Sequence, residues 1–176
     1  MSLSIQVGRY LNDHNMDYRL VHHPKTDNSM ATAILAYVSP QKLAKAVILE
    51  SSHGDEYCMA VIPADHKLKL SWVNNTLKKH FHLASEDSLL DLFDDCAVGA
   101  IPPLAEAYAM PSVWAVELLD ADELFFEAGD HRCLIQLAGK HVRELNAQGC
   151  FATISRNEAL DRVSRFPDID TGTFYH

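Results

Sequence analysis

The middle of the chain is marked by the segment DDCAVGAIPPL, residues 94–104. Pro102 and Pro103 lack backbone N–H donors and have a fixed φ, so the pair cannot lie inside a helix or a central strand. Gly99 can adopt backbone angles that are closed to other residues, and it lets a ligand approach the backbone closely. We therefore expect a short apolar strand before Gly99, a stiff loop with exposed amides over residues 99–103, and helix or irregular structure afterwards. A structural turn and a loop that holds a small polar group both fit this pattern.

Length and composition indicate one globular domain with a buried core. The chain has 176 residues, of which 48% are hydrophobic and 22% charged, which is an ordinary balance for such a domain. No apolar run is long enough to span a bilayer, and the first residues form no secretory signal. Four cysteines without a Cys-x-x-Cys pair predict reduced thiols. These patterns favour a cytoplasmic protein with no membrane partner.

The charge of the chain restricts its partners. The net charge is −9, from 15 basic and 24 acidic residues, which argues against DNA or a general nucleic-acid coat because such affinity comes largely from neutralised phosphates. A local basic patch can still hold one RNA end. The densest basic region fits either a solvated helix face or an RNA contact; it contains Lys67, Lys69, Lys78 and Lys79. The ten histidines show no ligand spacing, so we expect no metal and no cofactor.

Hydrophobic spacing predicts helices and strands in irregular alternation on both sides of the loop. Helices are expected near residues 3–11, 29–38, 71–81, 85–93 and 139–145, with Ser71 and Ser85 as N-caps, and strands at 18–22, 43–49, 57–62, 113–119, 124–126 and 133–137. Because there is no regular βαβ rhythm, we expect an α/β fold: a single compact domain with a curved, mixed, barrel-like β-sheet surrounded by helices. This domain is expected to cover residues 1–149. Residues 150–176 are interpreted as a C-terminal tail that is partly ordered or binds a partner.

Lys45 lies inside the predicted strand 43–49, whose other residues are all apolar. Lysine is rarely buried without a partner, because an ammonium group is costly to remove from water. In one interpretation the tip of the side chain reaches back to water. In the other the ammonium group lies in a cleft and faces an anionic or carbonyl-bearing ligand. The strand alone does not decide between them.

Three motifs occur in a fixed order along the chain: LAKAVIL at residues 43–49, GAIPP at 99–103 and FFEAGDH at 125–131. In this order and at these separations they resemble the YbaK family, also called the prolyl-tRNA-synthetase-associated domain. The resemblance extends from about Tyr18 to Leu145. It implies the α/β fold of that family and a free-standing, trans-editing aminoacyl-tRNA deacylase. Such relatives remove alanine, cysteine or a similar small amino acid, typically from tRNA for proline.

The resemblance also implies roles for individual residues. Lys45 matches the essential lysine of the family, and the loop that binds the aminoacyl group is matched by Gly99, Ala100, Ile101, Pro102 and Pro103. His22 falls where relatives often carry a pocket histidine. Where the synthetase-inserted relatives have a Phe-His-Pro-Leu-like segment, this chain has a glycine turn. In that turn we predict Gly129 and Asp130 to contact the substrate and His131 to be catalytic.

The chemistry of an aminoacyl ester fits these residue types. The ester is already activated, so hydrolysis needs a held carbonyl, a placed water and stabilisation of negative charge. The chain has neither a Gly-x-Ser-x-Gly elbow nor a cysteine with a neighbouring histidine. We expect the amides of residues 99–103 to hold the carbonyl or the α-amino group, and Lys45 to hold the terminal ribose or its phosphate. The ribose hydroxyl of the tRNA would help the water, with His131 or His22 as base.

Two other functions fit the same residues. One is a non-catalytic module of this fold that binds a tRNA end or a protein. The other is hydrolysis of a different small acyl ester, without RNA. The partner expected from the resemblance is the 3′ end of aminoacyl-tRNA. Because the chain is acidic, prolyl-tRNA synthetase or an elongation factor is expected to supply part of the affinity.

Overall fold

The computed structural model describes residues 3–54, 56–145 and 149–159. Its helices are α1 (Ile5–Asp13), α2 (Ser29–Leu35), α3 (Leu70–Leu77), α4 (Glu86–Leu92) and α5 (Gly139–Leu145), with 3-10 helices η1 (Ala105–Tyr108) and η2 (Val116–Leu118). Its strands are β1 (Tyr18–His22), β2 (Leu43–Ser51), β3 (Tyr57–Pro63), β4 (His66–Leu68), β5 (Phe81–Leu83), β6 (Ser112–Ala115), β7 (Glu123–Glu127), β8 (Cys133–Ala138), β9 (Cys150–Ala152) and β10 (Ser155–Asn157). No helix in these ranges is long and apolar enough to cross a membrane.

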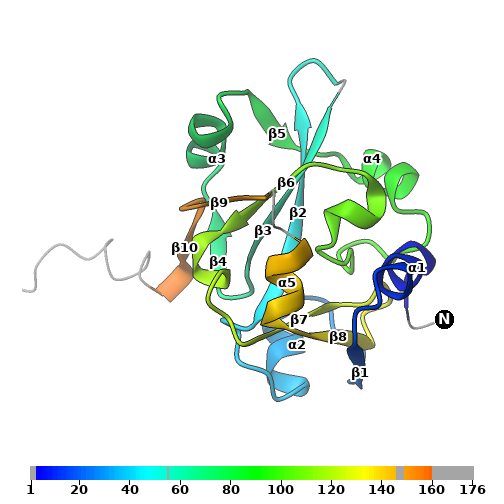
Figure 1. Cartoon of the computed structure of the whole chain (residues 1–176). Helices are drawn as coiled ribbons and strands as arrows, with labels where there is room; N and C mark the ends of the chain where they lie inside the picture. Colours follow the sequence, from blue (N-terminus) through cyan, green and yellow to red (C-terminus); the bar gives the residue numbers. More distant parts are fainter. Residues whose placement is uncertain (1–2, 55, 146–148, 160–176) are drawn as a thin grey trace, which may run out of the picture.

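The main sheet is mixed, as the irregular alternation of elements predicts. Its order is β1-β8-β7-β2-β3-β6-β9, with β5 paired to β2. Strand β2 is antiparallel to β3 and parallel to β7, and β3 is parallel to β6. The β2–β3 hairpin runs through the centre of the molecule, with α2 at one end and α3 near the other (Figure 1). The prediction of one α/β domain with a mixed sheet and surrounding helices is confirmed.

The core forms around β2 and β3 because their sequences are almost continuously apolar. Every residue of β3 after Tyr57 is buried, as expected for a central strand that is covered on both faces. Trp114 and Phe126 on the neighbouring strands are fully buried against them. Helix α1 adds Val7 and Leu11 from one face. The site residues of β2 therefore project from a rigid part of the fold.

Several local predictions are wrong. The expected strand before Gly99 is a series of turns, in which the Asp95 carboxylate accepts hydrogen bonds from Ser4 Oγ (2.7 Å) and the Gln6 amide (3.1 Å). The strand expected over residues 113–119 ends at Ala115 and continues as η2. Helix α3 has Lys69 as its N-cap, not Ser71.

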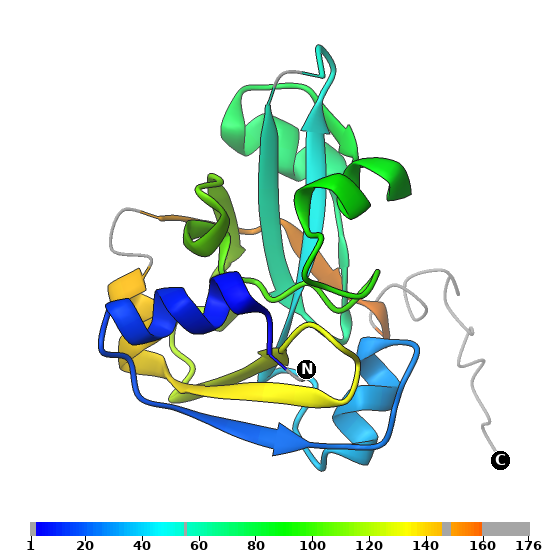
Figure 2. The same cartoon turned by 90° about the vertical axis from the view of Figure 1, so that its right-hand side faces the viewer.

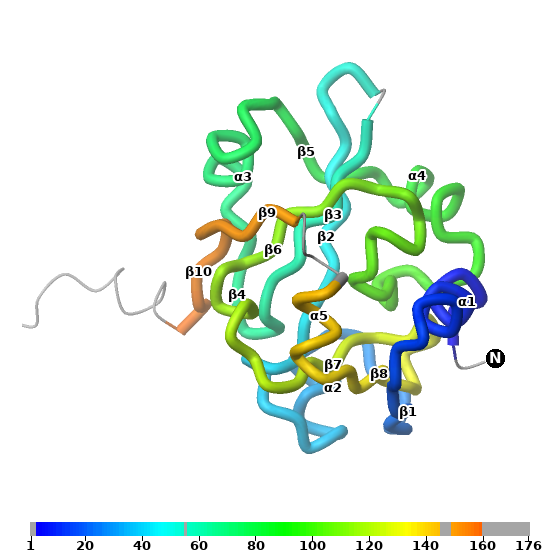
Figure 3. Tube along the Cα trace, viewed as in Figure 1, coloured from blue at the N-terminus to red at the C-terminus, as the bar shows by residue number. Residues whose placement is uncertain are grey.

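The last described residues add strands to the domain. Strand β9 pairs in parallel with β6, and β10 pairs antiparallel with β4. Both lie on the side of the molecule away from α1 (Figures 2 and 3). Residues 150–157, assigned to the tail from sequence, are thus paired with the domain. Residues 160–176 lie outside the described residues.

Candidate active site

Lys45 projects from the third position of β2 into a cavity. Its Nζ donates a hydrogen bond to the carbonyl oxygen of Ala64 at 2.9 Å, and the residue is half-buried. Burial lowers the pKa of Lys45, and the carboxylates of Glu158 and Asp65 act in the opposite direction. Of the two interpretations of this lysine, the structure therefore favours the cleft.

The cavity has a volume of about 340 Å³, at the small end of the range of ligand pockets. Segments that are far apart in sequence form its wall: Asn28, Ser29, Met30, Lys45, Ala64, Gly99, Glu127, His131 and Glu158. We call it the Lys45 cavity. It brings together three residues that the sequence analysis singled out from three separate motifs, Lys45, Gly99 and His131.

Gly99 and His131 are fixed against each other at this cavity. Gly99 has φ +83°, and a Cβ atom built on it would lie 3.4 Å from Cε1 of His131. His131 has φ +60°, and its Nε2 lies 2.7 Å from the carbonyl oxygen of Val98. Because a carbonyl oxygen only accepts, Nε2 must carry the proton. In the neutral ring Nδ1 is then the nitrogen that can take a proton from water.

The other residues of the predicted binding loop are buried: Ala100, Ile101, Pro102 and Pro103. The amide of Ala100 donates to the carbonyl oxygen of Ala97 at 3.0 Å. The prediction that this loop offers exposed amides is therefore wrong at Ala100, and the prolines carry none. The loop stiffens the backbone behind Gly99, which alone among its residues lines the Lys45 cavity.

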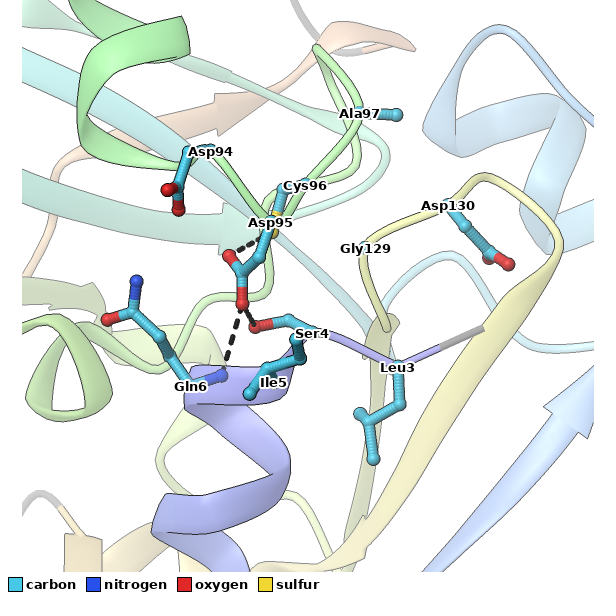
Figure 4. A pocket seen from close by; sticks show the side chains of 10 residues that line it. All are labelled: Leu3, Ser4, Ile5, Gln6, Asp94, Asp95, Cys96, Ala97, Gly129 and Asp130. Atoms are coloured by element: carbon cyan, nitrogen blue, oxygen red, sulfur yellow. Dashed lines mark hydrogen bonds between the residues drawn. The ribbon is translucent and has the colours of Figure 1, made fainter. Parts of the chain in front are cut away.

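Three predicted site residues lie elsewhere. His22 is exposed on β1, opposite Cys133. Gly129 and Asp130 line a second cavity of about 690 Å³ beside α1 (Figure 4). Asp94 and Asp95 also line it, so a group of carboxylates faces this cavity and would repel the phosphates of RNA. We therefore place the candidate active site at the Lys45 cavity.

Two carboxylates of the Lys45 cavity, Glu127 and Glu158, were not predicted from the sequence. Glu127 is only 8% exposed, and its Oε1 accepts a hydrogen bond from Thr32 Oγ1 at 3.1 Å. Burial raises the pKa of Glu127, and its buried Oε2 has no hydrogen-bond partner among the residues that the structure describes. A glutamate between Phe126 and Ala128 in the third motif was the available signal for this residue. Glu158 gave none, because its position depends on the pairing of β10 with β4.

Thiolate and metal chemistry find little support among the described residues. Burial raises the pKa of Cys58 to about 12, and those of Cys96 and Cys133 to about 11, so these thiols are protonated at neutral pH and are poor nucleophiles. No three His, Cys, Asp or Glu side chains within the described ranges are grouped to hold a metal ion. Hydrolysis at the Lys45 cavity would therefore rely on the lysine, the imidazole and water.

Comparison with known families decides the assignment of the domain. The model of the aminoacyl-tRNA editing domain matches residues 23–145. The chain belongs to the aminoacyl-tRNA editing domain family. The match includes Lys45, Gly99, Glu127 and His131 and ends before Glu158. This editing-family chain matches no curated protein sequence.

Solved structures share the fold of this editing-family chain. Hypothetical protein APE2540 is 21% identical, with a TM-score of 0.75 over 86% of this chain and 99% of its own. A structure described as a proposed trans-editing enzyme for prolyl tRNA synthetase is 17% identical, with a TM-score of 0.71 over 87% of this chain and 96% of its own. A structure described as a proposed signal transduction protein from Marinobacter aquaeolei VT8 is 15% identical, with a TM-score of 0.67 over 93% of this chain and 35% of its own. At these identities the similarity concerns the fold.

Proposed function

We propose that this protein hydrolyses the ester of mischarged aminoacyl-tRNA in the cytoplasm, removing a small amino acid such as alanine or cysteine from tRNA for proline. The observation that carries the proposal is one small cavity shared by Lys45, Gly99 and His131, three residues that lie within the matched editing domain. The resemblance to YbaK relatives and the similar fold of a proposed trans-editing enzyme for prolyl tRNA synthetase support the choice of tRNA.

Lys45 is suited to hold the negatively charged end of the substrate. Its ammonium group is already partly desolvated and donates a hydrogen bond to the backbone carbonyl of Ala64 at 2.9 Å. A phosphate about 4 Å away would gain roughly 4 kcal/mol near a protein surface, before the cost of its own desolvation. We assign Lys45 to the terminal ribose or its phosphate, which places the ester inside the cavity.

His131 is suited to be the base. Its Nε2–H is committed to the carbonyl of Val98 at 2.7 Å, which fixes the ring orientation and the tautomer. The remaining nitrogen, Nδ1, can receive a proton from the attacking water while the ribose hydroxyl of the tRNA assists. Positioned general bases of this kind contribute about 10²–10⁴-fold to a rate. His22 is not the base in this proposal, because it is exposed on β1 and does not line the cavity.

The size of the cavity explains which esters the site would accept. A synthetase pocket discriminates against a missing methylene group by only about 1–3 kcal/mol, so smaller amino acids are attached by error. The cavity of about 340 Å³ is bordered by Met30 and Ala64, and it has room for a small side chain beside the ribose. Because the chain has a net charge of −9, we propose that the synthetase or an elongation factor presents the tRNA.

The proposal is tested by a panel of charged tRNAs. The full-length protein is incubated with tRNA for proline that carries alanine, cysteine, serine or proline, and loss of the ester is followed over time. We expect the alanyl or cysteinyl ester to be hydrolysed at least about tenfold faster than the prolyl ester. If the protein binds the tRNA but all four esters stay intact, the proposed deacylase activity is contradicted and a binding module is favoured. Equal hydrolysis of a short alanyl-nucleoside and alanyl-tRNA would favour a general esterase.

A further inference from the structure

Glu158 belongs to a segment that lies outside the matched editing domain, residues 23–145, yet it lines the Lys45 cavity. Helix α2 contributes Ser29 and Met30 to the wall of the same cavity. A residue from beyond the family domain therefore completes the wall of the candidate active site.

The local structure holds Glu158 firmly. Its amide donates to the carbonyl oxygen of Asp65 at 2.9 Å, directly after the pairing of Asn157 with His66. The side chain of Asn157 donates to Asp65 Oδ2 at 2.7 Å. Two residues before Asn157 in the same strand, Ser155 Oγ lies 2.9 Å from Nδ1 of the buried His66. These contacts fix the backbone at Glu158 and leave its half-buried side chain at the cavity.

The wall of the Lys45 cavity carries groups of both charges, one ammonium group and two carboxyl groups. Lys45 supplies a cation, and the Glu158 carboxylate lines the same cavity and opposes the lowering of the Lys45 pKa by burial. Glu127 is the other carboxylate of the wall; it is buried, its Oε1 accepts a hydrogen bond from Thr32, and its Oε2 has no hydrogen-bond partner among the described residues. Burial raises the pKa of Glu127 and so favours its neutral form, which attracts an ammonium group less strongly. Glu158 is half-exposed, so its charged form loses less hydration than that of Glu127.

An aminoacyl ester carries charges that match this arrangement. Its phosphates are negative and its α-ammonium group, one carbon from the ester carbonyl, is positive. Lys45 attracts the phosphate end and repels the ammonium group. We propose that Glu158 is a specificity-determining residue whose carboxylate receives the α-ammonium group of the substrate. This inference rests on the proposed function and adds that the site selects esters with a free amino group.

The inference is tested by binding, with an analogue that cannot be hydrolysed. The first analogue, the alanyl analogue, is adenosine whose ribose 3′ oxygen is replaced by a nitrogen that is acylated with alanine. The second, the lactyl analogue, carries lactate instead, in which a hydroxyl group replaces the ammonium group. Titration calorimetry at pH 7 compares the wild type with Glu158→Gln, which keeps the shape of the side chain. The matched control is Glu117→Gln, because Glu117 is an exposed glutamate of η2 that does not line the cavity.

We expect the wild type and Glu117→Gln to bind the alanyl analogue about tenfold more tightly than the lactyl analogue. Glu158→Gln should bind both analogues with the affinity that the wild type shows for the lactyl one. The inference is overturned if Glu158→Gln keeps the tenfold difference in affinity between the two analogues. It is also overturned if the wild type binds both analogues with the same affinity or binds neither.

A parallel measurement separates this inference from the proposed function. A Glu158-dependent preference for the alanyl analogue, together with stable alanyl-tRNA, supports the ammonium site and overturns the deacylase. Conversely, if the wild type and Glu158→Gln hydrolyse alanyl-tRNA with the same KM and kcat, the deacylase stands and the role of Glu158 is overturned.

Discussion

Gly99 combines a backbone requirement with a contact at the candidate site. Its φ of +83° favours glycine, and the His131 ring lies 3.4 Å from the position that a Cβ atom would take. We expect Gly99→Ala to lower the free energy of unfolding by about 1 kcal/mol because of the left-handed backbone. Deacylation should fall at least about tenfold, because the added methyl group would pack directly against the His131 ring at the cavity. Urea unfolding and single-turnover rates measure the two effects.

The hairpin glycine Gly54 provides the matched control. It has φ +72°, and the nearest atom to an added Cβ would be Oε1 of Glu50 at 3.7 Å. Gly54→Ala should therefore lose a similar amount of stability and keep its deacylation rate. Equal activity of the two variants would contradict a role for the contact between Gly99 and His131.

Glu127 makes stability depend on pH. Its pKa in the folded protein is raised above the ordinary value of 4.5 by burial. Between 4.5 and the raised pKa the folded state binds more protons than the unfolded state, so stability falls as the pH rises through this window. Glu127→Gln keeps an acceptor for Thr32 and has no charge to bury. We expect the variant to gain stability relative to the wild type as the pH rises above about 4.5.

Urea unfolding of both proteins between pH 4 and pH 8 measures this difference. As the pH falls below 4.5 the carboxyl group becomes protonated in both states, so the difference should level off toward a constant value. A difference that does not change with pH would show that the carboxylate is not destabilised by burial.

At the scale of single elements, replacing Ser85 and Ser71 by alanine tests where helices α4 and α3 begin. Ser85 Oγ accepts a hydrogen bond from the amide of Ser88 at 3.1 Å and caps α4. Ser85→Ala should therefore lower stability by about 1 kcal/mol. Ser71 is exposed inside α3, where alanine has the higher helix propensity, so Ser71→Ala should be neutral or slightly stabilising. Thermal unfolding of both variants checks this, and equal losses would contradict the assigned helix starts.

Elements with a strong local signal were predictable from sequence. The apolar runs gave β2, β3 and β8 nearly in full, and the Ser85-Glu86-Asp87 pattern gave the start of α4. Elements that depend on distant contacts were not predictable. Strand β10 exists through its pairing with β4, and the turn before Gly99 through the contact of Asp95 with Ser4. Neither partner can be identified from the local sequence.

The same limit explains which part of the candidate site was predictable. Resemblance to the family and residue type singled out Lys45, Gly99 and His131, which share the cavity. Gly129 and Asp130 are neighbours of His131 in sequence but line the second cavity. The backbone turns here, with φ +128° at Gly129 and +60° at His131. Asp130 and His131 therefore line different cavities although they are adjacent in sequence.

The charge of the whole molecule makes a prediction about salt. With a net charge of −9 we expect few phosphate contacts, and each contact to a single strand contributes about 0.7 to the slope of log affinity against log salt. We expect log kcat/KM for charged tRNA to fall with log salt with a slope no steeper than about −2. The measurement is a series of initial rates at increasing NaCl concentrations. A slope several times steeper would reveal a basic tRNA-binding face and contradict assisted delivery.

The central claim is that the ammonium group of Lys45 supports ester hydrolysis in its cavity, and Lys45→Ala tests it most directly. Lys42→Ala is the control, since Lys42 pairs at the surface with Asp122 at 2.8 Å and Glu123 at 3.2 Å. Single-turnover deacylation of alanyl-tRNA for proline is measured after circular dichroism has shown that both variants are folded. We expect Lys45→Ala to lose at least about 100-fold in rate and Lys42→Ala to match the wild type; a wild-type rate in folded Lys45→Ala would contradict the claim.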